Sequence, residues 1–398
     1  MNERFGLLLE RMRIFKDEEK LSPDYIPSRL PHRNEEFKLL KKFFSGVVEG
    51  YSRVSTRVIV TGSVGTGKSA LVKLFGANSV EDAKKSGISL NFIYVNCRIS
   101  KNTLSILTRI IEQLRARLPT RGFSNEELFH KILSYLEARN LYAIIALDEV
   151  DTLISRQEDA LYLFSRIGEE RRVLPRISLI LITRNPEIFD LLDESTRSSL
   201  LGNVIHLREY SSGQLYDILK FRAEEAFLPG VLMEESLRLI ADLAGERGDA
   251  RYALDILWRA GKYAEAEGSM KVTPEHVRKA STSVYPSIRR EHLEYLDQHE
   301  QLILLALSRG LQEGQAYLTT SELNQYYRLI CEEYSIQPKA YTRFWEHLQR
   351  LDDLGIIRIN VRSEGMKGRR SYISIPGIPV SILQRELESI LKREKKFR

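Results

Sequence analysis

The sequence predicts an α/β fold, a doubly wound parallel sheet, that continues into a small all-helical unit and a winged helix. Three observations predict this order. Apolar runs typical of buried strands alternate with helical patterns up to about residue 208. Only helical patterns follow, as far as about residue 284. From residue 291 onward, three helical patterns precede two short strand patterns. We therefore expect domains at 1–208, 209–284 and 291–398.

The expected elements follow from periodicity and from glycine and proline positions. The first 20 residues fit a charged amphipathic helix, and residues 25–33 form a loop rich in proline. Strands are expected at 57–60, 88–97, 142–147, 177–183 and 204–207. Helices of the sheet domain are expected at 35–49, 102–118, 126–139 and near 158–171. Helices of the second unit are expected at 212–227, 233–244, 249–266 and 274–282.

A glycine-rich loop follows the first strand and opens a helix. Residues 62–69 read GSVGTGKS, which fits the pattern GxxxxGK[ST] of a phosphate-binding P-loop. Its glycines let backbone N–H groups surround phosphate oxygens, and the helix N-terminus adds positive charge. Lys68 would reach the β- and γ-phosphates, and the hydroxyl of Ser69 would bind Mg²⁺. The loop therefore predicts an ATP or GTP site formed by Gly62, Gly65, Thr66, Gly67, Lys68 and Ser69.

Carboxylates follow the buried strand at 142–147. Asp148 and Glu149 come directly after this apolar run, at the carboxyl edge where open α/β sheets bind ligands. Asp148 is expected to hold Mg²⁺, directly or through water. Glu149 is the expected base that orients or polarises an attacking water. Asp151 more readily caps the next helix.

Composition narrows the class of protein. No apolar run approaches the roughly 20 residues that a membrane helix needs, and the chain start lacks a signal-peptide pattern. Two cysteines without metal-type spacing fit a reducing cytoplasm and argue against zinc. The net charge is +6, and residues 362–398 alone hold ten Lys or Arg against four Glu. The excess positive charge therefore lies at the C-terminal end and indicates an anionic partner.

The last domain fits a winged helix. Helices are expected at 299–307, from Thr319 or Thr320 to about 333, and at 339–354, before a hairpin at 356–361 and 370–375. In helix-turn-helix proteins the start of the last helix contacts base edges. The candidates here are Lys339, Tyr341, Thr342 and Arg343. The hairpin tip offers Arg362, Lys367, Arg369 and Arg370 for phosphates or the minor groove. Winged helices also serve as protein-binding modules, and that alternative stays open.

These motifs together resemble the archaeal origin-recognition/cell-division-cycle initiator family of AAA+ ATPases, over nearly the whole chain. The resemblance rests on the segments DYIPSRLPHRNEE (24–36), the P-loop, LDEVD (147–151), REYSSGQLYDILKFRAEEAF (208–227) and GDARYALDIL (248–257). The resemblance implies an AAA+ P-loop NTPase with an α-helical lid that binds ATP or ADP with Mg²⁺. It implies adenine packing by the N-terminal element, here Tyr25, Ile26, Pro31, His32 and Arg33. It also implies duplex DNA contact by the helix at 102–118, with Arg109 and Arg115.

The same resemblance suggests a γ-phosphate contact from the lid. Asp249 can cap the helix at 249–266, which leaves Arg251 in its first turn, facing the P-loop. Lid position would then report the nucleotide state.

Two departures from the family pattern concern hydrolysis. The family has a trans-acting arginine finger where this chain has Ser195, and Arg197 matches the basic residue that follows. The sensor after the fourth strand is usually Ser/Thr-Asn, but here the order is Thr183, Arg184, Asn185. Either Asn185 serves after a one-residue shift or Arg184 replaces it. Because an arginine finger can be worth about 10³–10⁵ in rate, we expect slow hydrolysis.

The leading functional hypothesis is a cytoplasmic, nucleoid-associated replication initiator. It would bind double-stranded origin DNA and help recruit the replicative helicase, with paralogous initiators as further partners and ATP hydrolysis as a switch. One alternative is a paralogue that occupies the origin as a regulator. Another is a helper NTPase of the transposition or defence type, for which the lid motif gives no support.

Overall fold

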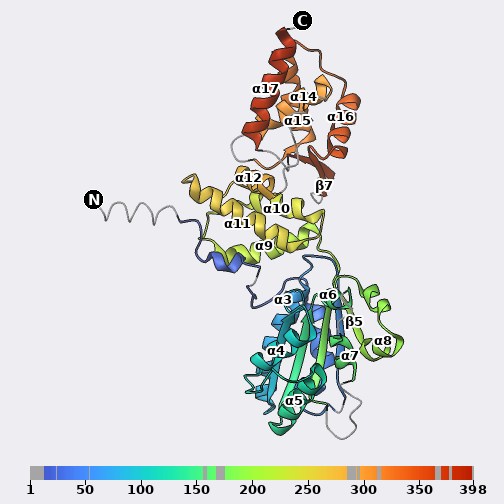
Figure 1. Ribbon diagram of the computed structural model, residues 1–398. Helices are drawn as coiled ribbons and strands as arrows, with labels where there is room; N and C mark the ends of the chain where they lie inside the picture. The colour runs from blue at the N-terminus through green and yellow to red at the C-terminus, as the bar shows by residue number, and fades with distance from the viewer. Residues whose placement is uncertain are drawn as a thin grey trace, which may run out of the picture. The chain divides into compact units, whose positions relative to one another are not determined.

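The computed structural model describes residues 13–23, 25–52, 54–155, 159–166, 175–284, 293, 296–311, 315–363, 369–375 and 379–396. The chain divides into two compact units (Figure 1). The sheet unit comprises Ile26–Gln214 and Arg247–Ala250, and the helical unit comprises Met1–Tyr25, Leu215–Glu246 and Arg251–Arg398. The backbone therefore passes between the units at four places.

A parallel sheet forms the centre of the sheet unit. Its strands in the described part of the chain have the order β2-β3-β4-β1-β5. They are β1 (Arg57–Thr61), β2 (Leu90–Asn96), β3 (Tyr142–Asp148), β4 (Ile177–Thr183) and β5 (Asn203–His206). All residues of β3 and β4 are buried, which explains their continuous apolar sequences. The expected α/β class and parallel sheet are confirmed.

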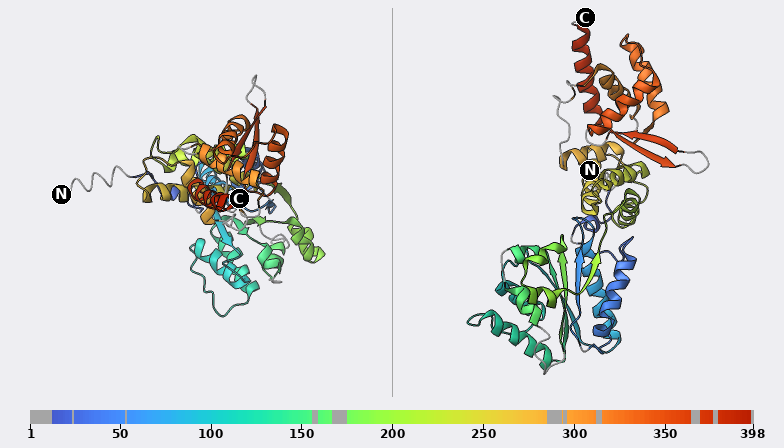
Figure 2. Two further views of the ribbon diagram at one scale, coloured as in Figure 1. Left: turned by 90° about the horizontal axis from the view of Figure 1, so that it is seen from above. Right: turned by 90° about the vertical axis from the view of Figure 1, so that its right-hand side faces the viewer.

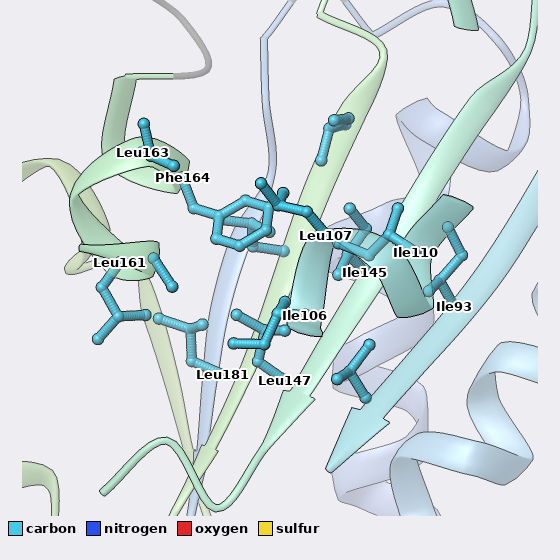
Figure 3. Packing of buried hydrophobic residues seen from close by; sticks show 14 of the residues in the cluster. Ile93, Ile106, Leu107, Ile110, Ile145, Leu147, Leu161, Leu163, Phe164 and Leu181 are labelled. Atoms are coloured by element: carbon cyan, nitrogen blue, oxygen red, sulfur yellow. The ribbon is translucent and has the colours of Figure 1, made fainter. Parts of the chain in front are cut away.

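Helices cover both faces of this sheet, as the right-hand view of Figure 2 shows. One face packs on α2 (Asn34–Val48) and α3 (Lys68–Lys85), through alternate strand residues such as Val58 and Ile144. The other face packs on α4 (Thr103–Gln113), α5 (Asn125–Ala138) and α7 (Ala160–Ser165). In that second core, Ile106, Leu107 and Ile110 of α4 lie over Ile145 and its neighbours (Figure 3). The other helices in the described part of this unit are α6 (Asp151–Ser155), η3 (Pro186–Leu191) and α8 (Glu194–Leu200).

Helix α4 is shorter than the sequence predicts. It ends at Gln113, and Arg115 has a φ of +53°. The N–H of Ala116 donates to the carbonyl of Ile111, which is the long hydrogen bond of a Schellman ending. Arg115 therefore lies beyond the helix on which it was expected.

The first part of the helical unit is a set of lid helices. They are α9 (Ser212–Ala226), α10 (Glu234–Gly245), α11 (Ala250–Ala266) and α12 (Pro274–Val284), close to the expected bounds. The described part of the expected N-terminal helix is not helical before η1 (Glu18–Leu21). Phe15 instead pairs with Phe227, with ring centroids 4.7 Å apart, and the N–H groups of Lys16 and Asp17 donate to the carbonyl of Ala226. Tertiary pairing with the lid thus overrides the local helical pattern there.

The second part of the helical unit is a winged helix. It contains α14 (Gln298–Gly310), β6 (Leu318–Thr319), α15 (Thr320–Glu333), α16 (Tyr341–Asp353), β7 (Arg358–Ser363), β8 (Arg369–Ser374) and α17 (Val380–Lys396). The strands form a sheet of order β6-β8-β7. Thr319 caps α15 through a capping box, as expected. Helix α17 was not predicted, since the last element expected from the sequence is the hairpin strand at 370–375. Its Leu383 and Leu387 are buried in the core.

A buried arginine joins the lid to the winged helix. Arg278 of α12 is 1% exposed. Its guanidinium donates to the carbonyls of Ile375 at 3.2 Å, Gln315 at 3.2 Å and Ala316 at 3.3 Å. Glu275, one turn earlier, lies 3.5 Å from the same guanidinium.

A second polar contact lies on α10. Asp242 accepts hydrogen bonds from the Tyr317 hydroxyl at 2.6 Å and from the Asn360 amide at 2.9 Å. Lid and winged helix are thus joined by hydrogen bonds that involve several elements of each. Among the described helices, none combines the length and apolarity that crossing a membrane requires.

Candidate functional site

Two glycines of the P-loop have backbone conformations that disfavour other residues. Gly65 and Gly67 have φ of +77° and +87°, in the left-handed region that favours glycine. A Cβ on Gly65 would lie 1.8 Å from a carboxylate oxygen of Asp249, so only glycine fits beneath that side chain. The N–H of Ala250 donates to the carbonyl of Gly65 at 3.1 Å. The segment 247–250 therefore completes the loop.

Lys68 and Ser69 lie at the start of α3, as the motif predicts. The amine of Lys68 donates to the carbonyls of Gly62 at 2.6 Å and Ser63 at 2.7 Å. Thr66 is buried, and its hydroxyl donates to the carbonyl of Ser63 at 2.9 Å. The side chains of Thr66 and Lys68 therefore both donate hydrogen bonds to carbonyls of the loop itself.

The carboxylate of Asp148 is within hydrogen-bond reach of the P-loop serine. Ser69 donates to its Oδ2 at 2.5 Å, and the N–H of Glu149 donates to its Oδ1 at 2.8 Å. The hydroxyl of Tyr94 on β2 also donates to Oδ2. A serine hydroxyl beside a buried carboxylate is the donor set that P-loop proteins use for Mg²⁺. The residues present therefore fit this cation.

Glu149 follows on a strained backbone. Its φ of +56° is unusual for a residue with a side chain. Its carboxylate lies 3.9 Å from Arg98 and 4.0 Å from Arg184. The side chain of Asn185 caps η3 by accepting the N–H of Glu187 at 3.0 Å. Of the two sensor candidates, Arg184 is thus the one beside the candidate base.

The N-terminal element is divided between the two units. Tyr25 lies in the helical unit, where Lys20 and Arg222 lie 4.3 and 4.9 Å from its ring. Ile26 and His32 are exposed, His32 with a φ of +61°, and Pro31 is partly buried.

Arg33 is buried, and its guanidinium is used within the protein. It donates to the carbonyl of Thr66 at 3.2 Å, to the Tyr210 hydroxyl at 2.9 Å and to the carbonyl of Arg208 at 2.5 Å. It also stacks over the Tyr210 ring at 4.0 Å. A Cβ on Gly67 would lie 3.0 Å from the Tyr210 hydroxyl. This geometry makes Arg33 a support for the P-loop.

The residues expected to influence ATP hydrolysis from the lid and from the finger position lie on α11 and α8. Arg251 is exposed in the first turn of α11, as expected, and belongs to the helical unit. On α8, Ser195 stands in the first turn, while Arg197 pairs with Asp190 at 2.7 Å.

Among the candidate DNA-binding residues of the winged helix, the exposed ones are Lys339, Tyr341, Thr342, Arg343 and Arg370. Tyr341, Thr342 and Arg343 form the exposed first turn of α16, and Arg343 pairs with Glu346 at 2.6 Å. Lys339 precedes the helix, since Ala340 is its N-cap. Arg362 and Arg370 are opposite each other in the β7–β8 register, and Arg369 begins β8 beside them. Lys367 lies outside the described residues. In the sheet unit, Arg109 of α4 pairs with Glu112 at 2.9 Å.

Sequence reasoning missed three residues at the site, namely Tyr94, Arg98 and Tyr210. Strand alternation could have placed Tyr94 on the α3 face, because it follows Ile93, whose side chain faces α4. Its contact with Asp148 depends on tertiary distance and has no sequence signal.

Comparison with known proteins agrees with this architecture. Residues 55–192 match an AAA domain, residues 216–282 a Cdc6 AAA+ ATPase-type lid domain, and residues 291–383 a CDC6 C-terminal winged helix domain. The chain is 35% identical to ORC1-type DNA replication protein 2 of Saccharolobus solfataricus over 372 residues, which is 91% of this chain and 90% of the relative.

Two solved structures extend the comparison. The crystal structure of Cdc6p from Pyrobaculum aerophilum has a TM-score of 0.80 at 30% identity, over 96% of this chain and 99% of the other. The Aeropyrum pernix ORC1 protein in complex with DNA has a TM-score of 0.62 at 30% identity, over 96% of this chain and 97% of the other. The chain thus combines an AAA domain, a Cdc6-type lid and a CDC6-type winged helix, and it belongs to the ORC1/Cdc6 family of AAA+ replication proteins.

Proposed function

We propose that this protein is an ATP-binding initiator that recognises origin duplex DNA, helps recruit the replicative helicase and uses slow ATP hydrolysis as a switch. The observation that carries the proposal is the pairing of Ser69 with Asp148 at 2.5 Å in a chain that ends in a winged helix. The Ser69–Asp148 pair would form part of a nucleotide site, and the winged helix would provide a DNA-binding surface.

The nucleotide part of the proposal assigns a task to each group at the P-loop. Backbone N–H groups and Lys68 would bind the phosphates, and Ser69 and Asp148 would hold Mg²⁺, which screens the phosphate charge when bound. Glu149 would orient the attacking water. Arg251 would contact the γ-phosphate from the lid.

Slow hydrolysis is supported by the surroundings of Glu149. Arg98 and Arg184 lie within 4.0 Å of its Oε2, so an attacking water would compete with two cations for that oxygen. In addition, Ser195 stands where the family pattern has an arginine, so the chain would give a neighbour no finger from that position. Both features favour a long-lived ATP-bound state.

The DNA part of the proposal rests on the exposed first turn of α16 and on the basic hairpin. Tyr341 and Arg343 would contact base edges, and the arginines of β7 and β8 would contact phosphates. The similar Aeropyrum pernix ORC1 structure is a complex with DNA, which supports DNA as the partner of this chain.

A selection from genomic DNA tests this function. The protein with ATP would be mixed with sheared DNA of its host, and the bound fragments sequenced. Enrichment of one or a few intergenic loci with repeated elements is the expected result. Uniform recovery across the genome would contradict origin recognition and favour a non-specific helper NTPase.

A second candidate is an origin-bound regulator that recruits no helicase. The residue that favours it is Ser195, because a protein without a finger cannot complete a neighbour's site in the usual way. Capture of the replicative helicase on origin DNA, with and without this protein, separates the two candidates.

A further inference from the structure

We propose that Tyr94 is a positioning residue for the Mg²⁺ site and that it links this site to helix α4. The proposal rests on the Mg²⁺–nucleotide function proposed above. It concerns a tyrosine that belongs to neither the P-loop nor the carboxylate motif.

The first step is the set of donors around Asp148. Oδ2 accepts the hydroxyls of Ser69 and Tyr94, and Oδ1 accepts the N–H of Glu149. A carboxylate offers about four lone-pair positions, so these donors leave about one, on Oδ1. Tyr94 thus fixes the carboxylate in one orientation and directs its remaining lone pair.

The second step is the placement of the Tyr94 ring, which packs against the hydrophobic core shared with α2 and α3. The amine of Lys73 lies 4.5 Å from the ring centroid, on the same face of the sheet as α3, and holds the ring from that helix.

The third step is the pair of hydrogen bonds between α4 and the backbone of Tyr94. Among the described strands, β2 is at the edge of the sheet, so no described strand pairs with its outer N–H and carbonyl groups. The side chain of Gln113 supplies both partners. It accepts the N–H of Tyr94 at 3.1 Å and donates to the Tyr94 carbonyl at 2.9 Å.

Helix α4 itself is firmly seated. Ile106, Leu107 and Ile110 are at most 1% exposed and pack with Ile93 and Ile145 of the adjoining strands, as Figure 3 shows. A displacement of α4 would reach Tyr94 through Gln113, and through its hydroxyl it would reach Asp148. The helix that the family resemblance assigns to DNA thus has a physical connection to the metal carboxylate.

The test compares nucleotide affinity with and without Mg²⁺ in full-length protein. The dissociation constant for fluorescent ADP would be measured in excess Mg²⁺ and in EDTA, and their ratio gives the Mg²⁺ enhancement. Y94F removes the hydroxyl and keeps the ring. We expect the enhancement to fall about tenfold, the scale of losses when a metal ligand loses its outer support. The constant in EDTA should change by less than about twofold.

Y162F is the matched control, because Tyr162 of α7 is 41% exposed in the same unit. It should leave both constants unchanged. An unchanged or larger enhancement in Y94F overturns the proposal. If the wild-type protein itself shows no Mg²⁺ enhancement, the proposed nucleotide function fails as well, so the two failures are distinguishable.

A double-mutant cycle tests the link to α4. Q113L removes both hydrogen bonds to the Tyr94 backbone, and L104A is its control, because Leu104 is an exposed residue of the same helix. We expect Q113L to lower the Mg²⁺ enhancement and to add little in the Y94F background, since contacts in one chain of interactions are non-additive. Full additivity of Y94F and Q113L would contradict the link.

Discussion

Replacing Arg278 by methionine should uncouple the lid from the winged helix. The guanidinium donates to three carbonyls at 3.2 to 3.3 Å from a side chain that is 1% exposed. A hydrogen bond from a charged donor contributes about 1.5–3 kcal/mol, and the lower value applies at these long distances, which gives about 4.5 kcal/mol for three. Relief of the desolvation of a buried charge offsets part of this, so we expect a net loss of about 3 kcal/mol.

The two tryptophans make this loss measurable domain by domain. Trp258 lies on lid helix α11 and Trp345 on winged-helix α16, so W345F and W258F backgrounds report on one domain each. In urea, both fluorescence transitions should coincide when Arg278 is present. In R278M the Trp345 transition should move to lower urea by about 1.5 M, taking a denaturant slope of about 2 kcal/mol per M.

Arg259 provides the control. It pairs with Asp255 on the surface of α11, so R259M should cost less than about 0.5 kcal/mol. Coincident transitions in R278M, with a midpoint within about 0.3 M of the wild type, would refute the argument that Arg278 joins the domains.

Three other predictions follow from the described contacts. R184A should raise steady-state ATP hydrolysis by up to about fivefold, since an exposed ion pair with Glu149 is worth at most about 1 kcal/mol; an unchanged rate of phosphate release would show that this arginine does not restrain the glutamate. R369A with R370A should weaken binding to all duplex sequences and lower the log–log salt slope by about 0.9 for each lost phosphate contact; an unchanged slope would place the hairpin off the DNA. Burial, with Lys339 and His347, lowers the pKa of His299 despite the opposing charge of Asp297, so its stabilising contribution is present above the usual histidine pKa of about 6.5 and is lost as the pH falls below it. H299Q should therefore reduce the fall in urea midpoint between about pH 7 and about pH 5, and an undiminished fall would contradict this assignment.

The sheet unit was predictable because its signals are local. β3 and β4 are buried along their whole length, so their sequences are continuous apolar runs. The P-loop positions follow from backbone needs, which glycine satisfies at Gly65 and Gly67. Asp148 could be placed because it directly follows a buried strand.

Features that depend on tertiary contacts could not be predicted. The segment around Phe15 has a helical charge pattern, yet its N–H groups bond to the carbonyl of Ala226. The role of Arg33 in adenine packing came from the family resemblance, whereas its guanidinium contacts the P-loop backbone and Tyr210. The basic content of the chain end concealed the buried leucines of α17.

The interleaving of the two units has a consequence for how this chain can be divided and made. A chain cut after Gln214 would lack residues 247–250, and with them the hydrogen bond to Gly65 and the Asp249 carboxylate above it. At the other end, the N–H of Ile14 bonds to Glu265, 251 residues away. During synthesis the phosphate loop and the N-terminal segment must both wait until the lid helices have left the ribosome. Contacts between residues so distant in sequence slow folding. Because residues 247–250 lie between lid helices in the sequence, the nucleotide site is complete only after part of the lid has been made.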